Sequence, residues 1–257
     1  MLMNVADVSF NYGTTQIIKD VSFDLGEPNL TCIIGPNGVG KTTLARCVNR
    51  LLKPHSGKVL LSDVNINDMT LRELATHLGY VPNVSGDTFP MSVVDTVLMG
   101  RHPRGGWTPT NRDLEIVEET IHIMGLDDFA MRDFNELSAG QHQKVMIARG
   151  LAQEPDVLIL DEPTSNLDVR HQIEVMELLH KLVREKGLMV LMVCHDLNIT
   201  ARYADRIIMM SDGGVFSDGT AKEVITEENI MRVYGVRSKV IEVEGRPHVI
   251  LLSTATN

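Results

Sequence analysis

The sequence predicts an α/β fold in which helices cover a mostly parallel sheet. Three short apolar runs, at 31–34, 157–160 and 188–194, have the composition of buried strands. Helical patterns alternate with them, as expected for parallel strands joined by crossover helices. Each run ends at a glycine-rich loop or at a polar residue. Because ligands of such sheets bind beyond the carboxyl ends of the strands, we expect one site there.

Length and composition narrow the class of protein. A chain of 257 residues with 43% hydrophobic content suits one large α/β domain or two small ones. The net charge of −10 argues against nucleic acid as a partner. No apolar run approaches the ~20 residues that span a bilayer, and no signal segment precedes the first strand, so a cytoplasmic chain is expected. Cys32, Cys47 and Cys194 lack metal-site spacing and are predicted to be reduced core thiols.

The N-terminal region is predicted to form an antiparallel pair of strands. Apolar residues alternate or nearly alternate within 5–10 and 21–25, and the turn residues 11–13 lie between the two runs. The other elements expected before residue 82 are a helix from Leu44, a strand at 58–61, a helix capped by Thr70 and Glu73 that ends near His77, and a strand at 78–81.

Residues 82–154 are expected to form a helical insert. Ser92 and Asp95 have the spacing of a second capping box, and 101–109 reads as an exposed loop that carries the only tryptophan, Trp107. That tryptophan is either a packed anchor or a partner contact. Two longer helices are predicted, one at 111–124 with Leu114, Val117, Ile121 and Met124 on its apolar stripe, and one from Ser138 to about Ala152.

The C-terminal part begins with a long helix that Asp168 can cap and Gly187 can end. Its expected apolar face consists of Val169, Ile173, Met176, Leu179 and Val183. A hairpin is predicted at 206–219 around Asp212-Gly213-Gly214. Two short helices and a final strand pair around Glu244-Gly245 complete the chain.

Residues 35–43 form the most specific motif. They read GPNGVGKTT, which matches G-x-x-x-x-G-K-T between an expected strand and an expected helix. Glycines allow backbone N–H groups to point inward, and the helix N-terminus adds positive charge, so phosphate oxygens fit. Lys41 is expected to reach the β- and γ-phosphates, and the Thr42 hydroxyl to bind Mg²⁺. A structural glycine-rich turn is the weaker alternative.

Two acids follow the apolar strand 157–160. A buried, unpaired carboxylate is costly, so Asp161 is expected to meet a cation, and Mg²⁺ fits. Glu162 points differently and is expected to polarise a water for phosphoryl transfer. Capping of a nearby turn is the alternative for one acid alone. His195 ends another strand, either as a hydrogen-bonded core histidine or as a residue beside the γ-phosphate.

These motifs resemble those of an ATP-binding cassette (ABC) ATPase, the nucleotide-binding subunit of a transporter. Leu137-Ser138-Ala139-Gly140-Gln141 is similar to the family signature, which usually has Gly at its third position. The stretch 157–168 reads VLILDEPTSNLD and matches the Walker B strand, the catalytic glutamate and the D-loop. His195 matches the switch histidine. The order and spacing also match, so the resemblance covers nearly the whole chain.

The resemblance implies a single ABC ATPase domain over 1–257. Its P-loop NTPase core comprises 1–81 and 155–235 and includes the N-terminal antiparallel β subdomain. Residues 82–154 form the helical subdomain with the signature, and 236–257 form a C-terminal β-hairpin.

In the family, ATP lies between the phosphate loop of one subunit and the signature helix of a second copy, in a head-to-tail dimer. A helix start at Ser138 fits this, because it offers an anion site without a phosphate of its own, and an ordinary cap does not explain a helical glycine. The resemblance assigns ATP to Tyr12, Gly35, Asn37, Gly38, Gly40, Lys41, Thr42, Thr43, Ser138, Gly140, Gln141 and Asp168. It assigns catalysis to Glu162, His195 and Asn83, and Mg²⁺ to Thr42, Asn83 and Asp161. Core packing is the alternative for Tyr12, the adenine-stacking position.

One position departs from the family pattern. Gln is usual after Tyr80-Val81-Pro82, where it contacts Mg²⁺ and the attacking water, and this chain has Asn83. Asn keeps the amide but is shorter by about one C–C bond, a change that affects reactions sensitive to positioning. Slow but real hydrolysis is predicted, and an ATP-binding module with little hydrolysis is the alternative.

The segment 89–103 resembles subunits of importers for iron-siderophores, haem and cobalamin. The resemblance implies that the surface around 83–107 receives an integral membrane permease, that the chain sits at the cytoplasmic face of the membrane, and that a separate solute-binding protein delivers the cargo. A soluble ABC ATPase that works without a membrane is the rival reading. Paired cassettes or a long coiled coil, which such proteins carry, are absent from the sequence.

Overall fold

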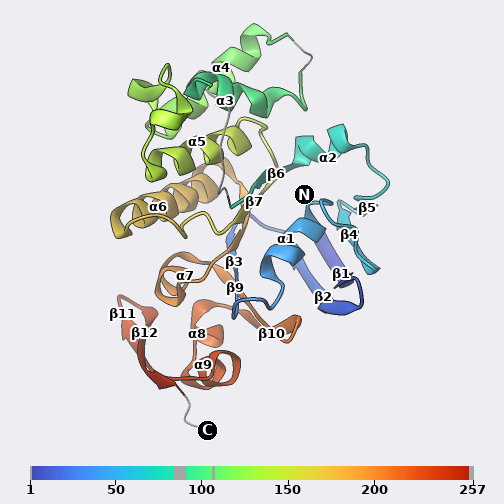
Figure 1. Cartoon of the computed structure of the whole chain (residues 1–257), viewed down its shortest axis with the longest axis vertical. Helices are drawn as coiled ribbons and strands as arrows, with labels where there is room; N and C mark the ends of the chain where they lie inside the picture. The colour runs from blue at the N-terminus through green and yellow to red at the C-terminus, as the bar shows by residue number, and fades with distance from the viewer. Residues whose placement is uncertain (1, 84–90, 106–107, 255–257) are drawn as a thin grey trace.

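A computed structural model of the chain describes residues 2–83, 91–105 and 108–254 (Figure 1). Its central sheet contains β3 (Leu30–Ile34), β6 (Leu78–Val81), β7 (Val157–Asp161), β8 (Met189–Val193), β9 (Arg206–Ser211) and β10 (Gly214–Gly219). The strand order is β10-β9-β3-β8-β7-β6, with β10 antiparallel to β9 and all other neighbours parallel. The predicted α/β fold with a mostly parallel sheet is confirmed.

Alternate residues of the central strands bury opposite faces of this sheet. On β3, Cys32 and Ile34 belong to one apolar cluster together with residues of α6 (Val169–Lys186). Ile33 belongs to a second cluster together with residues of α1 (Lys41–Val48). Because side chains alternate along a strand, an uninterrupted apolar run is what a sheet covered on both faces requires.

The N-terminal antiparallel sheet is also confirmed. It consists of β1 (Met3–Tyr12), β2 (Thr15–Leu25), β4 (Ser56–Leu61) and β5 (Val64–Asn65), in the order β2-β1-β4-β5. The first turn lies after Tyr12, at Gly13, whose φ of 57° suits glycine. Strand pairing therefore extends through residues 11 and 12, which were expected to be part of the turn. The side of this sheet that faces α1 completes the second apolar cluster.

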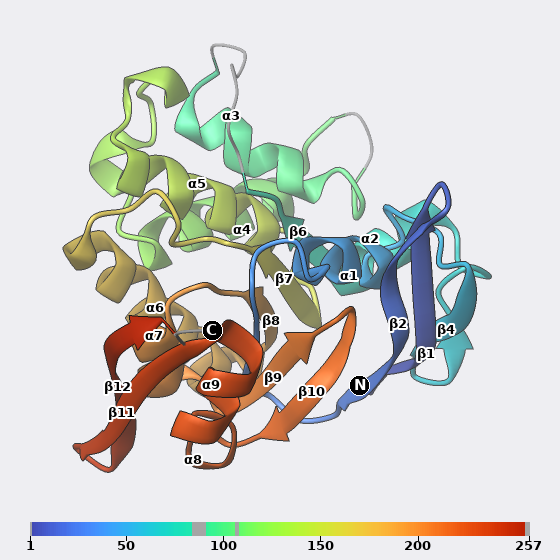
Figure 2. The same cartoon turned by 60° about the horizontal axis from the view of Figure 1, so that its bottom comes forward.

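The helices α3 (Val93–Leu98), α4 (Asn111–Ile123) and α5 (Ala139–Leu151) gather at one end of the molecule, away from the N-terminal sheet (Figures 1 and 2). The capping box that starts α2 (Leu71–His77) is present as predicted, with Thr70 and Glu73. At α3 only half of the expected box forms. Ser92 Oγ accepts from the backbone N–H of Asp95, but it also donates to the Asp95 carboxylate, which therefore does not reach back to the helix start.

On α4 and α6 the buried apolar face is shorter than the sequence predicted. Leu114 of α4 is 48% exposed, and Val169 of α6 is 71% exposed. Val117 and Leu179, further along these helices, are buried. Ile173, on the second turn of α6, is 38% exposed. The helical period shows which side of a helix faces inward, whereas the length of the neighbouring core decides how many turns are covered.

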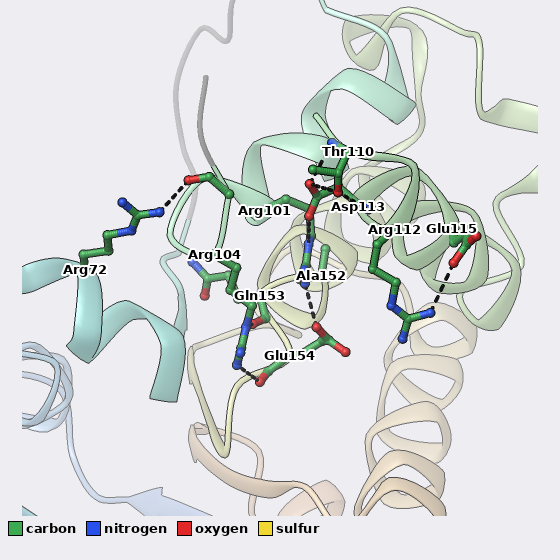
Figure 3. Close-up of polar contacts among 11 residues, drawn as sticks. Arg72, Arg101, Arg104, Thr110, Arg112, Asp113, Glu115, Ala152, Gln153 and Glu154 are labelled. Carbon is green, nitrogen blue, oxygen red and sulfur yellow. Dashed lines mark hydrogen bonds and ion pairs between the residues drawn. The ribbon is translucent and has the colours of Figure 1, made fainter. Parts of the chain in front are cut away.

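The segment 101–105 was expected to be an exposed loop, and this is wrong for Arg101, whose side chain is buried. Its guanidinium donates to Asp113 Oδ1 (2.9 Å), to the carbonyl of Ala152 (2.6 Å) and to Glu154 Oε2 (2.8 Å) (Figure 3). These partners lie on α4 and just beyond the end of α5. A buried arginine with three acceptors holds the segment against both helices. Trp107 lies outside the described residues.

A second arginine ties the same segment to the core. Arg104 donates to the carbonyls of Thr76 (2.7 Å), Gln153 (2.5 Å) and Glu154 (2.7 Å). Arg72 of α2 donates in turn to the carbonyls of Pro103 (2.9 Å) and Gly105 (2.7 Å). We call residues 101–105 the arginine strap, because the segment bridges α2, α4 and the chain after α5 (Figure 3).

The C-terminal part contains α7 (Leu197–Tyr203), α8 (Ala221–Val224), α9 (Glu227–Tyr234) and the hairpin of β11 (Val236–Val243) and β12 (Arg246–Thr254). The two helices and the hairpin follow the prediction, while α7 was not predicted. Asp196 caps α7 by accepting from the N–H groups of Asn198 and Ile199. Asn198 also pairs with the backbone of Val249, which attaches β12 to α7. None of the described helices is long and apolar enough to cross a bilayer.

Candidate active site

The loop between β3 and α1 has a backbone that only glycine tolerates at two positions. Gly35 and Gly40 have φ angles of 149° and 104°. A Cβ on Gly35 would lie 2.5 Å from the carbonyl oxygen of Met210, and one on Gly40 would lie 2.6 Å from the side chain of Ile18. The loop thus lies tightly on β9 and β2. No side chain caps the start of α1, so the N–H groups of its first turn can receive an anion.

Lys41 begins α1 and folds back over this loop. Its buried Nζ donates to the carbonyls of Gly35 (2.8 Å) and Pro36 (2.9 Å). Burial lowers the pKa of Lys41, and the carboxylates of Glu162 and Asp161 oppose this effect. An ammonium group has three donors, so one remains for a phosphate oxygen at this position.

Asp161 ends β7 with a nearly inaccessible side chain that has two hydroxyl partners. Thr42 Oγ1 donates to Oδ1 (2.7 Å), and Tyr80 donates to Oδ2 (3.2 Å). Burial and the neighbouring Asp161 raise the pKa of Tyr80, while a hydrogen bond with Arg46 opposes them. A buried carboxylate beside a threonine hydroxyl is a set of hard oxygen ligands, so the residues present fit Mg²⁺.

Glu162 is held at both oxygens of its carboxylate. Oε1 lies 2.5 Å from Nε2 of His195, and Oε2 accepts from Nδ2 of Asn83 (3.1 Å). Its φ of 53° is in the left-handed region, an uncommon conformation for a residue with a side chain and one that recurs at functional sites. Asn83, assigned to Mg²⁺ as well as to catalysis, contacts Glu162 rather than the Thr42–Asp161 pair.

The predicted convergence of three strand ends is therefore present. The ends of β3, β8 and β7 are neighbours in the sheet, and their loops form a cavity of about 520 Å³. Tyr12 lies at its rim, half exposed, with its ring edge-on to Phe10 at 4.9 Å. The cavity is lined by Tyr12, Ile17, Asn37, Gly38, Gly40, Lys41, Thr42, Thr43, Glu162 and His195.

The described residues that line this cavity include none of Ser138, Gly140, Gln141 and Asp168. Ser138 and Gln141 satisfy each other in a capping box, in which Ser138 Oγ accepts from the Gln141 N–H (3.3 Å) and Gln141 Oε1 accepts from the Ser138 N–H (2.9 Å). Asp168 caps α6. Within one copy, Ser138, Gln141 and Asp168 serve to cap helices, and Gly140 lies in the first turn of α5.

Sequence reasoning missed three residues near the site. Ile17 lines the cavity, Tyr80 binds Asp161, and Arg46 binds Tyr80. The signal for Tyr80 was present, because a hydroxyl in a buried strand needs a polar partner. No sequence signal pointed to Ile17. The alternation of residues along a strand does not show which loop will pack against a given side chain.

The geometry matches a phosphate-binding ATPase, and comparison with known proteins decides the family. The family model described as "ABC transporter" matches residues 18–165, more than half of the chain. The chain belongs to the ABC transporter family. As an ABC ATPase, it binds and hydrolyses ATP.

Relatives match along almost the entire chain of this ABC ATPase. An uncharacterized ABC transporter ATP-binding protein of Methanocaldococcus jannaschii is 41% identical and covers 97% of this chain and 98% of its own. The ferric enterobactin transport ATP-binding protein of Escherichia coli K12 is 36% identical, over 95% of this chain and 92% of its own.

Two solved structures show the same architecture. One is an inward-facing ABC transporter described as of the metal-chelate type, with a TM-score of 0.84, 27% identity, and coverage of 97% of this chain and 96% of that one. The other is a dimeric bacterial ABC transporter cassette, with a TM-score of 0.74, 30% identity, and coverage of 85% and 98%.

Proposed function

We propose that this ABC ATPase is the ATP-hydrolysing subunit of an importer for a metal chelate of the iron-siderophore, haem or cobalamin class. The observation that carries the proposal is the 36% identity to the ferric enterobactin transport protein, which extends over 92% of that protein's length. The match covers 95% of this chain, so it extends beyond the nucleotide-binding motifs.

In the proposed reaction, a water oxygen bonds to the γ-phosphorus of ATP while the bond from that phosphorus to the β–γ bridging oxygen breaks. Glu162 accepts the proton of the water, and ADP and phosphate leave. His195 and Asn83 hold the Glu162 carboxylate in place. Lys41 offers its remaining N–H to the phosphates. Mg²⁺, which Thr42 and Asp161 would hold, neutralises phosphate charge when bound.

We further propose that ATP lies between two copies of the chain. Ser138 caps the start of α5 and does not line the cavity of its own copy, so a phosphate there would come from a second one. The similar dimeric cassette supports this arrangement. ATP binding would close the dimer, with Ser138, Gly140, Gln141 and Asp168 facing the partner's Lys41 loop.

The remaining partners are an integral membrane permease and, indirectly, an extracytoplasmic solute-binding protein. In this proposal the permease contacts the helical subdomain 82–154, on the side of Asn83 and the arginine strap. Asn83 then connects the contact to the reaction, because its amide holds Glu162 Oε2. The chain would thus work at the cytoplasmic face of the membrane.

The proposal is tested by affinity purification of the tagged chain from the membranes of its own cells. Co-purification of a permease, with ATPase activity that changes when a metal chelate and its binding protein are added, is the expected result. The tagged Lys41→Ala variant serves as the control for activity. Recovery of the chain from the soluble fraction only, with ribosomes or chromosomal proteins, would contradict the importer and favour a soluble ABC ATPase.

A further inference from the structure

Gly140, in the first turn of α5, lies directly beneath the imidazole ring of His171 on α6. A Cβ on Gly140 would lie 2.4 Å from Cδ2 and 2.7 Å from Cγ of that ring. Contacts this short do not occur between carbon atoms, so glycine is the residue that allows the two helices to approach here. The helical glycine that a simple cap left unexplained therefore has a packing partner within its own copy.

The ring of His171 is held at its other side. Its Nδ1 lies 2.9 Å from Oδ1 of Asp168, and the same oxygen accepts from the backbone N–H of His171 (2.9 Å). The side chain is only 32% exposed. If the ring rotated away from Gly140, it would lose its contact with Asp168. The ring therefore stays over Gly140 and sets the distance between the start of α5 and α6.

A second contact joins the same helices further along. Lys144 of α5 lies 2.9 Å from Glu174 of α6, and Arg170 lies 2.9 Å from the other oxygen of Glu174. The helices run side by side in this region (Figure 1). The ion pair between Lys144 and Glu174 holds the middle of α5 against α6. The His171 ring determines where the N-terminus of α5 lies.

We infer that His171 is a positioning residue that joins the D-loop to the signature helix of the same copy. It sets the start of α5 relative to Asp168, so that Ser138, Gly140 and Asp168 present one rigid surface to ATP on the second copy. This inference rests on the proposed ATP sandwich. His171 lies outside the family motifs, and its ring leaves no room for a side chain at Gly140, the second residue of α5.

The test uses the full chain carrying Glu162→Gln, so that bound ATP accumulates. Three variants are compared in this background: His171→Ala, Gly140→Ala and the two together. Lys181→Ala, an exposed change on the same helix, is the matched control. Sedimentation velocity measures the ATP concentration that gives half-maximal dimer, and a fluorescent ATP analogue measures nucleotide binding by the monomer.

His171→Ala is expected to raise the ATP concentration for half-maximal dimer by at least about fivefold, with monomer affinity unchanged within about twofold. In the chain with native Glu162, it should raise the apparent KM for ATP by a similar factor, because ATP is hydrolysed only in the dimer, while the affinity of the monomer for ATP stays the same. A residue that merely stabilises the fold would shift the melting temperature without this split. Gly140→Ala should weaken the dimer further, and adding His171→Ala should partly restore it, because the smaller side chain makes room for the new methyl group.

Two negative outcomes are distinguishable. If the Glu162→Gln parent forms the dimer and His171→Ala forms it equally well, the role of His171 is refuted and the sandwich stands. If the parent itself stays monomeric at saturating ATP, the sandwich and the inference built on it both fail. Strictly additive effects of the two substitutions would also refute the contact as the coupling element.

Discussion

Nε2 of His195 lies 2.5 Å from Oε1 of Glu162, although the two residues are 33 positions apart in the sequence. Glu162 directly follows β7, and His195 comes two residues after β8, the neighbouring parallel strand. With Asn83 on the other oxygen, the carboxylate is fixed from both sides.

Glu162→Gln is expected to lower the ATPase rate by at least about 100-fold, because the amide cannot accept the proton of the attacking water. Binding of ATP should persist, since the phosphate loop 35–43 is unchanged. Steady-state phosphate release and equilibrium binding check the two parts, with the exposed change Glu177→Gln as control. Equal rates for wild type and Glu162→Gln would mean that this residue is not the base.

Asn83→Ala should lower kcat roughly tenfold, because Glu162 loses the donor on Oε2 and is held by His195 alone. Asn83→Gln adds one methylene and should change both the rate and its dependence on Mg²⁺ concentration. The exposed Asn67→Gln is the control. If neither substitution at 83 changes rate or metal dependence, the side chain does not act at the reacting centre.

Lys41→Ala should abolish ATP-induced stabilisation. At an ATP concentration of 100 times Kd, ligand binding adds about 2.7 kcal/mol to the free energy of unfolding of the wild-type chain. The variant loses the charge that faces the phosphates and should show no shift in melting temperature with ATP. Lys58→Ala, an exposed lysine on β4, should behave as wild type. A shift of normal size in Lys41→Ala would place the phosphates elsewhere.

The arginine strap should make the fold sensitive to acid. Hydrogen bonds from Thr110 and the Arg101 guanidinium lower the pKa of Asp113 to about 2. Its ionised form is thus favoured in the folded state, so this contribution to stability is complete above the ordinary pKa of an aspartate, about 4. It is lost as the pH falls from about 4 to 2. Urea unfolding at a series of pH values measures the free energy of unfolding across this window.

Asp113→Asn should remove that part of the pH dependence and leave the buried Arg101 without its charged partner on α4. We expect a loss of about 3 kcal/mol in the free energy of unfolding near pH 7. Asp128→Asn, an exposed change, is the control. A variant as stable as wild type would show that Ala152 and Glu154 suffice for Arg101.

Local patterns determined the phosphate loop, the buried strands and most helix caps. A strand period, a capping box or a G-x-x-x-x-G-K-T loop is written within a few consecutive residues, so it can be read without knowing the fold. The relation between strands also followed, since the carboxyl ends of parallel strands meet. For these reasons Lys41, Thr42, Asp161, Glu162 and His195 were placed together from the sequence.

Tertiary structure alone decided which distant side chains touch. The burial of Arg101 depends on acceptors at 113, 152 and 154, and the exposure of Leu114 and Val169 depends on where the neighbouring core ends. Residues far apart in the chain also meet at Glu162, which contacts His195 and Asn83. The same is true of Gly140, which packs against the ring of His171. Such contacts depend on how whole elements pack, and that packing is not encoded in any short stretch of sequence.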